Sequence, residues 1–90
     1  MDFIDTFQAQ KINNLLSEGR SRISQANNFY NKKQYTNALK FYKDAKMNFE
    51  NANEFASYFI GTDAYTEEAQ RNISDCIAKI SKIRNNQLEK

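Results

Sequence analysis

Few side chains in this sequence of 90 residues could take part in catalysis. Histidine, the usual general base, does not occur, and the two glycines, Gly19 and Gly61, are too isolated to form a phosphate-binding loop. Cys76 is the single cysteine, and it falls on an apolar helix face, where a thiol is normally an inert small hydrophobe. We therefore expect no catalytic residues, no cofactor and no enzymatic activity.

Metal binding has equally little support in the sequence. One cysteine and no histidine cannot make a zinc site. Glu50 and Glu54 lie one helical turn apart and could in principle share a hard cation, but a solvated helix face explains them better. We expect no metal, and stability must come from buried apolar surface or from oligomerisation.

Apolar residues at helical spacing predict the elements that carry these side chains. In the middle of the chain they recur in steps of four and three on a single face, which predicts a helix over 35–60 ending at Gly61. The same spacing predicts helices over 7–31 and 63–88. Gly19 falls on the apolar face of the first helix, where a close approach within one helix is favoured over a break.

Three amphipathic helices of similar length with short connections predict an all-α fold. Short turns make consecutive helices antiparallel, so we expect an up-down-up three-helix bundle. Residues 1–90 form a single helical domain, with residues 1–6 either a cap on the bundle or a separate extension. No segment is apolar enough to span a membrane, and the N-terminus does not resemble a secretory signal, so a cytoplasmic location is expected.

The stretch ANNFYNKKQYTNALKFYKDA, residues 26–45, resembles the helical hairpin of a tetratricopeptide repeat (TPR). Small and aromatic residues stand at the spacings of that family on both sides of the turn. The sequence departs from the family in Lys33, where a glycine is common, and in the absence of a second copy about 34 residues on. The matching positions are Ala26, Phe29, Tyr35, Ala38, Tyr42 and Ala45.

A closed three-helix version of this hairpin resembles the MIT domain (microtubule-interacting and trafficking). The spacing of Tyr35, Ala38, Tyr42 and Ala45 is similar to that of the second helix of the family. Members dock short peptide motifs in grooves between helices, which implies a peptide partner and an adaptor role. On this resemblance the groove lies between the second and third helices. On the TPR resemblance it lies on the first helix, at Arg20, Ile23, Asn27, Tyr30 and Asn31.

Two further surfaces could bind partners. The expected topology brings the lysines of the first turn and the second helix close to the C-terminus, and the acidic residues to the opposite end. That basic end could attract an acidic peptide, nucleic acid or an anionic surface, although solvated lysines explain it as well. Its residues are Lys32, Lys33, Lys40 and Lys43, with Lys82, Arg84 and Lys90; the acidic end holds Glu50, Glu54, Asp63, Glu67 and Glu68.

Phe3 and Phe7 lie one turn apart but point away from the apolar face of the first helix. They either cap the bundle or form an interface with a partner or a second copy. The leading hypothesis for the whole chain is a non-enzymatic protein-protein interaction module that binds a peptide or helix in an inter-helical groove. The alternatives are a small nucleic-acid-binding or regulatory protein that uses the basic end, and a structural homodimer whose heptad-spaced faces complete each other.

Overall fold

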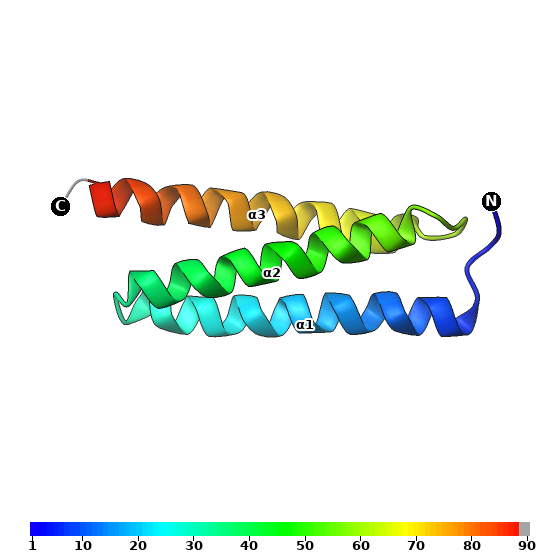
Figure 1. The fold of residues 1–90 in the computed structure, drawn as a ribbon, viewed down its shortest axis with the longest axis horizontal. Helices are drawn as coiled ribbons and strands as arrows, with labels where there is room; N and C mark the ends of the chain where they lie inside the picture. The colour runs from blue at the N-terminus through cyan, green and yellow to red at the C-terminus, as the bar shows by residue number, and fades with distance from the viewer. Residues whose placement is uncertain (89–90) are drawn as a thin grey trace.

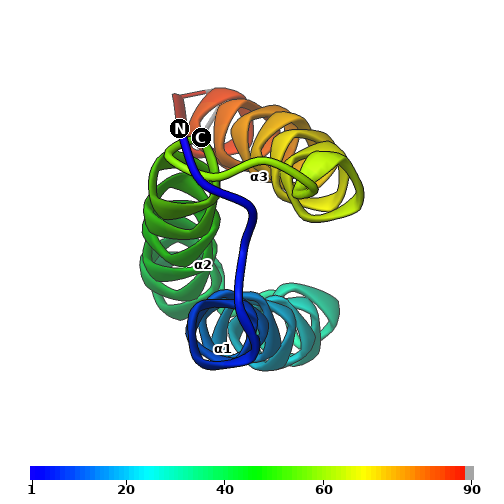
Figure 2. The same cartoon turned by 90° about the vertical axis from the view of Figure 1, so that its right-hand side faces the viewer.

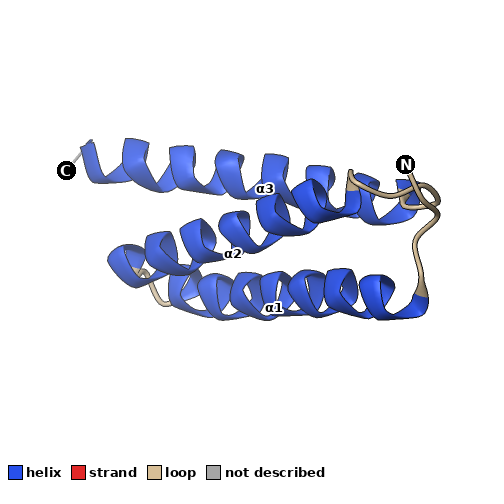
Figure 3. Cartoon of the chain, turned by 45° about the vertical axis from the view of Figure 1, so that its right-hand side comes forward, coloured by secondary structure: helices blue, strands red, loops and turns tan. Residues whose placement is uncertain are grey.

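The computed structural model describes residues 1–88, so Lys90 lies outside the described residues. Three helices form an antiparallel up-down-up bundle, which confirms the predicted all-α fold (Figures 1 and 3). They are α1 (Thr6–Asn31), α2 (Tyr35–Ala56) and α3 (Asp63–Leu88). The molecule is a rod that measures 51 × 17 × 14 Å. Within the described residues, no helix has the length and apolar character that crossing a membrane requires.

The start of α1 is fixed by a reciprocal pair of hydrogen bonds. The Asp5 carboxylate accepts from the Gln8 backbone N–H at 2.8 Å, and the Gln8 side-chain oxygen accepts from the Asp5 N–H at 3.0 Å. This capping box satisfies two of the amides that a helix start leaves unpaired. From there α1 runs without a break through Gly19, as the favoured interpretation predicted.

The turn between α1 and α2 is a Schellman motif without its usual glycine. The Gln34 N–H donates to the Phe29 carbonyl at 2.9 Å, and the Lys33 N–H donates to the Tyr30 carbonyl at 3.0 Å. Lys33 adopts the left-handed conformation that this motif needs, with φ of 62°. The chain therefore reverses in three residues, at a conformational cost that glycine would avoid.

The end of α2 differs from the prediction, because the helix stops at Ala56 and does not continue to residue 60. The Ser57 hydroxyl donates a hydrogen bond to the Glu54 carbonyl at 2.6 Å, and the Thr62 hydroxyl donates one to the Ala56 carbonyl at 2.9 Å. Thr62 is buried and so closes the end of α2. Gly61, with φ of 85°, lies in the following turn and does not cap the helix.

The N-terminal segment crosses the end of the bundle that holds the α2–α3 turn (Figure 2). The Ile60 N–H donates to the Asp2 carbonyl at 2.8 Å, and the Ile4 N–H donates to the Ile60 carbonyl at 3.0 Å. Phe3 and Ile60 thus form a short parallel bridge. Ile4 is half-buried against the core, so this residue anchors the segment.

The middle helix carries most of the packing. Helix α2 contacts both neighbours extensively, whereas α1 and α3 meet at few points, so the section of the bundle is open on one side (Figure 2). The core has two parts along the rod. One part contains Ile12, Leu16, Ala45, Phe49, Ala52, Ala56, Ala69 and Cys76, and the other contains Ala26, Ala38, Tyr42, Ile80 and Ile83.

Candidate functional site

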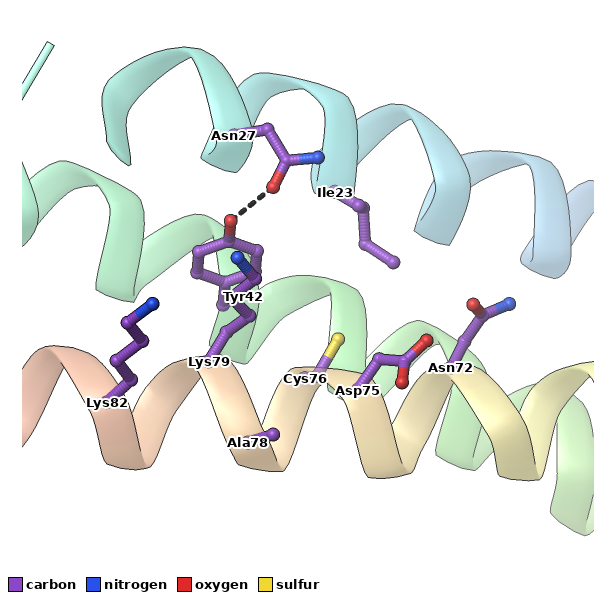
Figure 4. A pocket seen from close by; sticks show the side chains of 9 residues that line it. All are labelled: Ile23, Asn27, Tyr42, Asn72, Asp75, Cys76, Ala78, Lys79 and Lys82. Carbon is purple, nitrogen blue, oxygen red and sulfur yellow. Dashed lines mark hydrogen bonds between the residues drawn. The ribbon is translucent and has the colours of Figure 1, made fainter. Parts of the chain in front are cut away.

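The open side of the bundle holds a cleft between α1 and α3 with a volume of about 400 Å³ (Figure 4). Helix α2 forms its floor, because α1 and α3 pack on α2 and little on each other. We call this site the α1–α3 cleft. Its lining residues are Ile23 and Asn27 of α1, Tyr42 of α2, and Asn72, Asp75, Cys76, Ala78, Lys79 and Lys82 of α3.

A buried tyrosine links the floor of the cleft to its α1 wall. The Tyr42 hydroxyl donates a hydrogen bond to the Asn27 side-chain oxygen, as Figure 4 shows. Burial raises the pKa of Tyr42, so its hydroxyl keeps its proton and stays a donor. Because Asn27 accepts through its oxygen, its amide nitrogen keeps both protons for another acceptor. Asn72, half-buried, lies on the opposite wall on α3.

Lysines line the end of the cleft that is closer to the α1–α2 turn. The Lys79 ammonium lies 4.8 Å from the centre of the Tyr30 ring, and the Lys82 ammonium lies 5.7 Å from it. These cation–π contacts hold two positive charges between α1 and α3. Tyr30, which is half-buried, therefore helps to position these two ammonium groups beside the cleft.

At its other end the cleft continues into a shallower depression that shares Ile23, Asn27 and Asn72. Here an Arg20 guanidinium nitrogen lies 2.6 Å from a Glu68 carboxylate oxygen. This is the ion pair that joins α1 to α3 among the described residues. Because both side chains are partly exposed, it contributes little stability, about 0.2–1 kcal/mol. Its role is to neutralise Arg20, which leaves Arg71 as the unneutralised cation of this depression.

The sequence-predicted binding residues fall on three different surfaces. Arg20, Asn27 and Tyr30 lie along the α1–α3 cleft, as described above. Asn31, Lys32, Lys33 and Lys40 are exposed at or near the α1–α2 turn. The α3 C-terminus lies at this same end of the rod (Figure 1). Lys43 instead lies in a groove on the other side of α3, between α2 and α3, which we call the α2–α3 groove.

The α2–α3 groove has two exposed apolar residues at its centre. Met47 is 61% exposed and Ile77 is 48% exposed. The rest of its lining is polar or charged for the most part, and Lys46 forms an ion pair with Glu50 at 3.1 Å. Glu50 is thereby paired with a lysine one turn away. Among the described residues, no group of three metal-ligating side chains comes together.

Most of the α3 wall of the cleft was not predicted from the sequence, which named only Lys82 of it, as part of the basic end. Asn72, Asp75, Lys79 and Lys82 supply this wall. In the sequence these residues flank the apolar face of α3. Periodicity predicts that this face is buried, but it does not predict that α1 lies apart from α3 and leaves the flanking residues open to a ligand.

Cys76 of α3 lines the cleft, but its thiol is not reactive. The residue is 1% exposed. The pKa of its thiol is raised to about 11, chiefly by burial and also by the nearby Asp75 carboxylate, while Lys46 acts in the opposite direction. Since the thiolate is the nucleophile, a thiol that stays protonated at neutral pH is a poor one.

Phe3 and Phe7 lie on the surface at the opposite end from the lysine-rich turn. They are 74% and 82% exposed, respectively. The N-terminal segment does cross the end of the bundle, but the side chain that packs there is Ile4.

Comparison of the chain with models of known protein families, with curated proteins and with solved structures gave no significant match. The resemblances to the TPR hairpin and to the MIT domain therefore stay predictions from the sequence pattern.

Proposed function

We propose that this chain is a non-enzymatic interaction module that binds a short peptide in the α1–α3 cleft. The observation that carries the proposal is the pair of asparagines, Asn27 and Asn72, on opposite walls above an apolar and aromatic floor. A side-chain amide can donate to a peptide carbonyl and accept from a peptide N–H. Two amides spaced along the cleft, one on each wall, therefore suit an extended backbone, and the half-buried Ile23 gives the peptide side chains an apolar contact (Figure 4).

The charges around the cleft favour a peptide that carries acidic residues. Lys79, Lys82 and Arg71 face it or its continuation, while Glu68 is occupied by Arg20. Asp75 is the remaining carboxylate of the lining. The excess of cations would speed association with an acidic ligand and make binding weaker at high salt.

The alternative of nucleic-acid binding at the basic end has less support. Lys32, Lys33 and Lys40 are exposed, but they project from a turn and an outer helix face. The aromatic ring nearest to the cationic end of the cleft, Tyr30, already carries two lysines on it. These contacts compete with a base for stacking on this ring.

The test starts with selection of peptides from a random peptide library displayed on phage. A selected peptide is then titrated calorimetrically into the wild type, Asn72→Arg and Ser81→Arg. Both variants place an arginine on α3, the first in the α1–α3 cleft and the second in the α2–α3 groove. We expect Asn72→Arg to weaken binding at least about tenfold, a loss of about 1.4 kcal/mol, and Ser81→Arg to leave it unchanged.

Circular dichroism melts of both variants show first that each is folded. Loss of binding only in Ser81→Arg would move the site to the α2–α3 groove. No selectable peptide, or equal binding by all three proteins, would contradict a peptide site in either place.

A further inference from the structure

The N-terminal segment has one paired backbone edge and one unpaired edge. Toward Ile60, the Asp2 carbonyl accepts a hydrogen bond and the Ile4 N–H donates one. Backbone groups of successive residues in an extended segment point to opposite sides. The N–H and carbonyl of Phe3 therefore point away from Ile60, and no hydrogen bond joins them to another described residue. This is the open edge of a very short sheet.

Exposed apolar residues form this bridge and follow it at the start of α1. Phe3 and Phe7 are 74% and 82% exposed, and Ile60, across the bridge, is 40% exposed. Together they leave a large apolar area exposed at this end of the molecule. An open backbone edge with apolar side chains beside it is the arrangement that strand addition uses: the main chain supplies hydrogen bonds and the side chains supply contact area.

The charge at this end identifies the chemistry of the partner. Asp2 and Asp5 flank the edge. Asp63 follows the α2–α3 turn, whose residue Ile60 is hydrogen-bonded to the N-terminal segment, and all three aspartates are exposed. The nearest lysine in the sequence, Lys11, has its ammonium 4.4 Å from the centre of the Phe55 ring. The edge is therefore an acidic surface.

We propose that the Asp2–Ile4 edge binds an extended, basic and apolar segment of another protein by strand addition. A second copy of this chain could make the same two backbone bonds, with Phe3 opposite Phe3. That pairing would bring the carboxylates of two acidic ends together, which is unfavourable. A segment of alternating basic and apolar residues makes the same backbone bonds, places basic side chains on the face of Asp2, and places apolar side chains on the face of Phe3. This surface is separate from the α1–α3 cleft and does not depend on it.

The experiment uses a short acetylated and amidated peptide of alternating valine and lysine as the probe. It is titrated into the full chain labelled with nitrogen-15 and followed by NMR at low salt. We expect the Phe3 amide to shift and to become protected from hydrogen exchange, while the cleft residue Asn72 is unchanged. The same peptide with a methylated central amide should bind about fivefold more weakly, because it loses one backbone hydrogen bond.

Two variants of the protein test the apolar contact and the charge attraction separately. Phe3→Ser should weaken binding, whereas Tyr58→Ser, which changes a residue 61% exposed off the edge, should not. Asp2→Asn should weaken binding at low salt and reduce its salt dependence.

Three outcomes would overturn the proposal. The first is no shift at Phe3 with millimolar peptide, and the second is equal affinity for a valine–glutamate peptide. The third is a Phe3 shift that depends on protein concentration without peptide, since this would assign the edge to a second copy. Each of these leaves the proposed peptide site in the cleft untouched.

Discussion

Gly19 on α1 lies directly against the ring of Phe49 on α2. A Cβ atom built at Gly19 would lie 2.7 Å from the Phe49 Cζ and 2.8 Å from Cε2. Phe49 is fully buried, so its ring has no solvent side to move into. The glycine is kept in the middle of a helix, where it is unfavourable by about 1 kcal/mol, because it lets α1 and α2 approach over this ring.

Gly19→Ala should therefore destabilise the protein, although alanine is the better helix former. The overlap forces a shift of the ring or the backbone that costs about 1–3 kcal/mol, more than the gain in helix propensity. Urea unfolding followed by circular dichroism measures the difference. Ser21→Ala, at an exposed position of the same helix, is the control and should be neutral or slightly stabilising. A more stable Gly19→Ala protein would contradict the close packing described here.

Lys33→Gly should stabilise the protein by about 1 kcal/mol. Lys33 holds φ of 62°, a conformation that is unfavourable for a residue with a Cβ by about 1–2 kcal/mol. Glycine removes this strain, and its greater freedom in the unfolded chain offsets part of the gain. Lys32→Gly is the control, because Lys32 has φ of −87° and should gain nothing. Thermal melts should therefore show a higher midpoint for Lys33→Gly and no increase for Lys32→Gly.

Cys76 should make stability depend on pH in alkaline solution. An ordinary thiol releases its proton near pH 9.0, whereas burial raises the pKa of Cys76 in the folded protein to about 11. Above the first value the folded state holds a proton that the unfolded state has lost, so stability falls as pH rises. The free energy of unfolding is therefore unaffected by this group below about pH 9, and it falls by roughly 3 kcal/mol by the time the pH has passed 11.

Urea unfolding at neutral pH and across this alkaline window measures the effect. Cys76→Ala should show a smaller decline, with the part due to Tyr42 retained, since burial raises the pKa of that residue as well. An unchanged decline in Cys76→Ala would assign the pH dependence to other groups.

Tyr42→Phe should cost about 1 kcal/mol of stability. The change removes the hydroxyl that donates to Asn27, and the net value of such a bond is about 0.5–1.5 kcal/mol. A double-mutant cycle with Asn27→Ala should find most of this energy in the pair. Tyr58→Phe, in the exposed turn, should have no effect. Additive losses in the cycle would show that the two side chains do not interact.

The helices and their buried faces follow from the sequence because apolar spacing is a local property. Ala38, Tyr42, Ala45 and Phe49 are all buried on one side of α2, as their steps of four and three require. The end of α2 could not be predicted in the same way. Phe59 and Ile60 continue the spacing, yet the hydrogen bonds of Ile60 to the N-terminal segment take the chain out of the helix.

The candidate site was only half predictable for a different reason. The TPR resemblance named Asn27 and Tyr30 on α1, but the distance between α1 and α3 depends on how each of them packs on α2. Arg20 meets Glu68 across the gap while Ile23 stays half-buried. The left-handed conformation of Lys33 could not be predicted either, because the sequence shows only that the turn lacks a glycine.

The limited contact between α1 and α3 has a consequence for how the molecule comes apart. Because each outer helix is held almost only by α2, α3 can detach while the α1–α2 hairpin keeps most of its contacts. The amides of α3 should then exchange with solvent through a partial opening whose free energy is below that of global unfolding. In this respect the rod resembles a short row of units that depend only on their nearest neighbours.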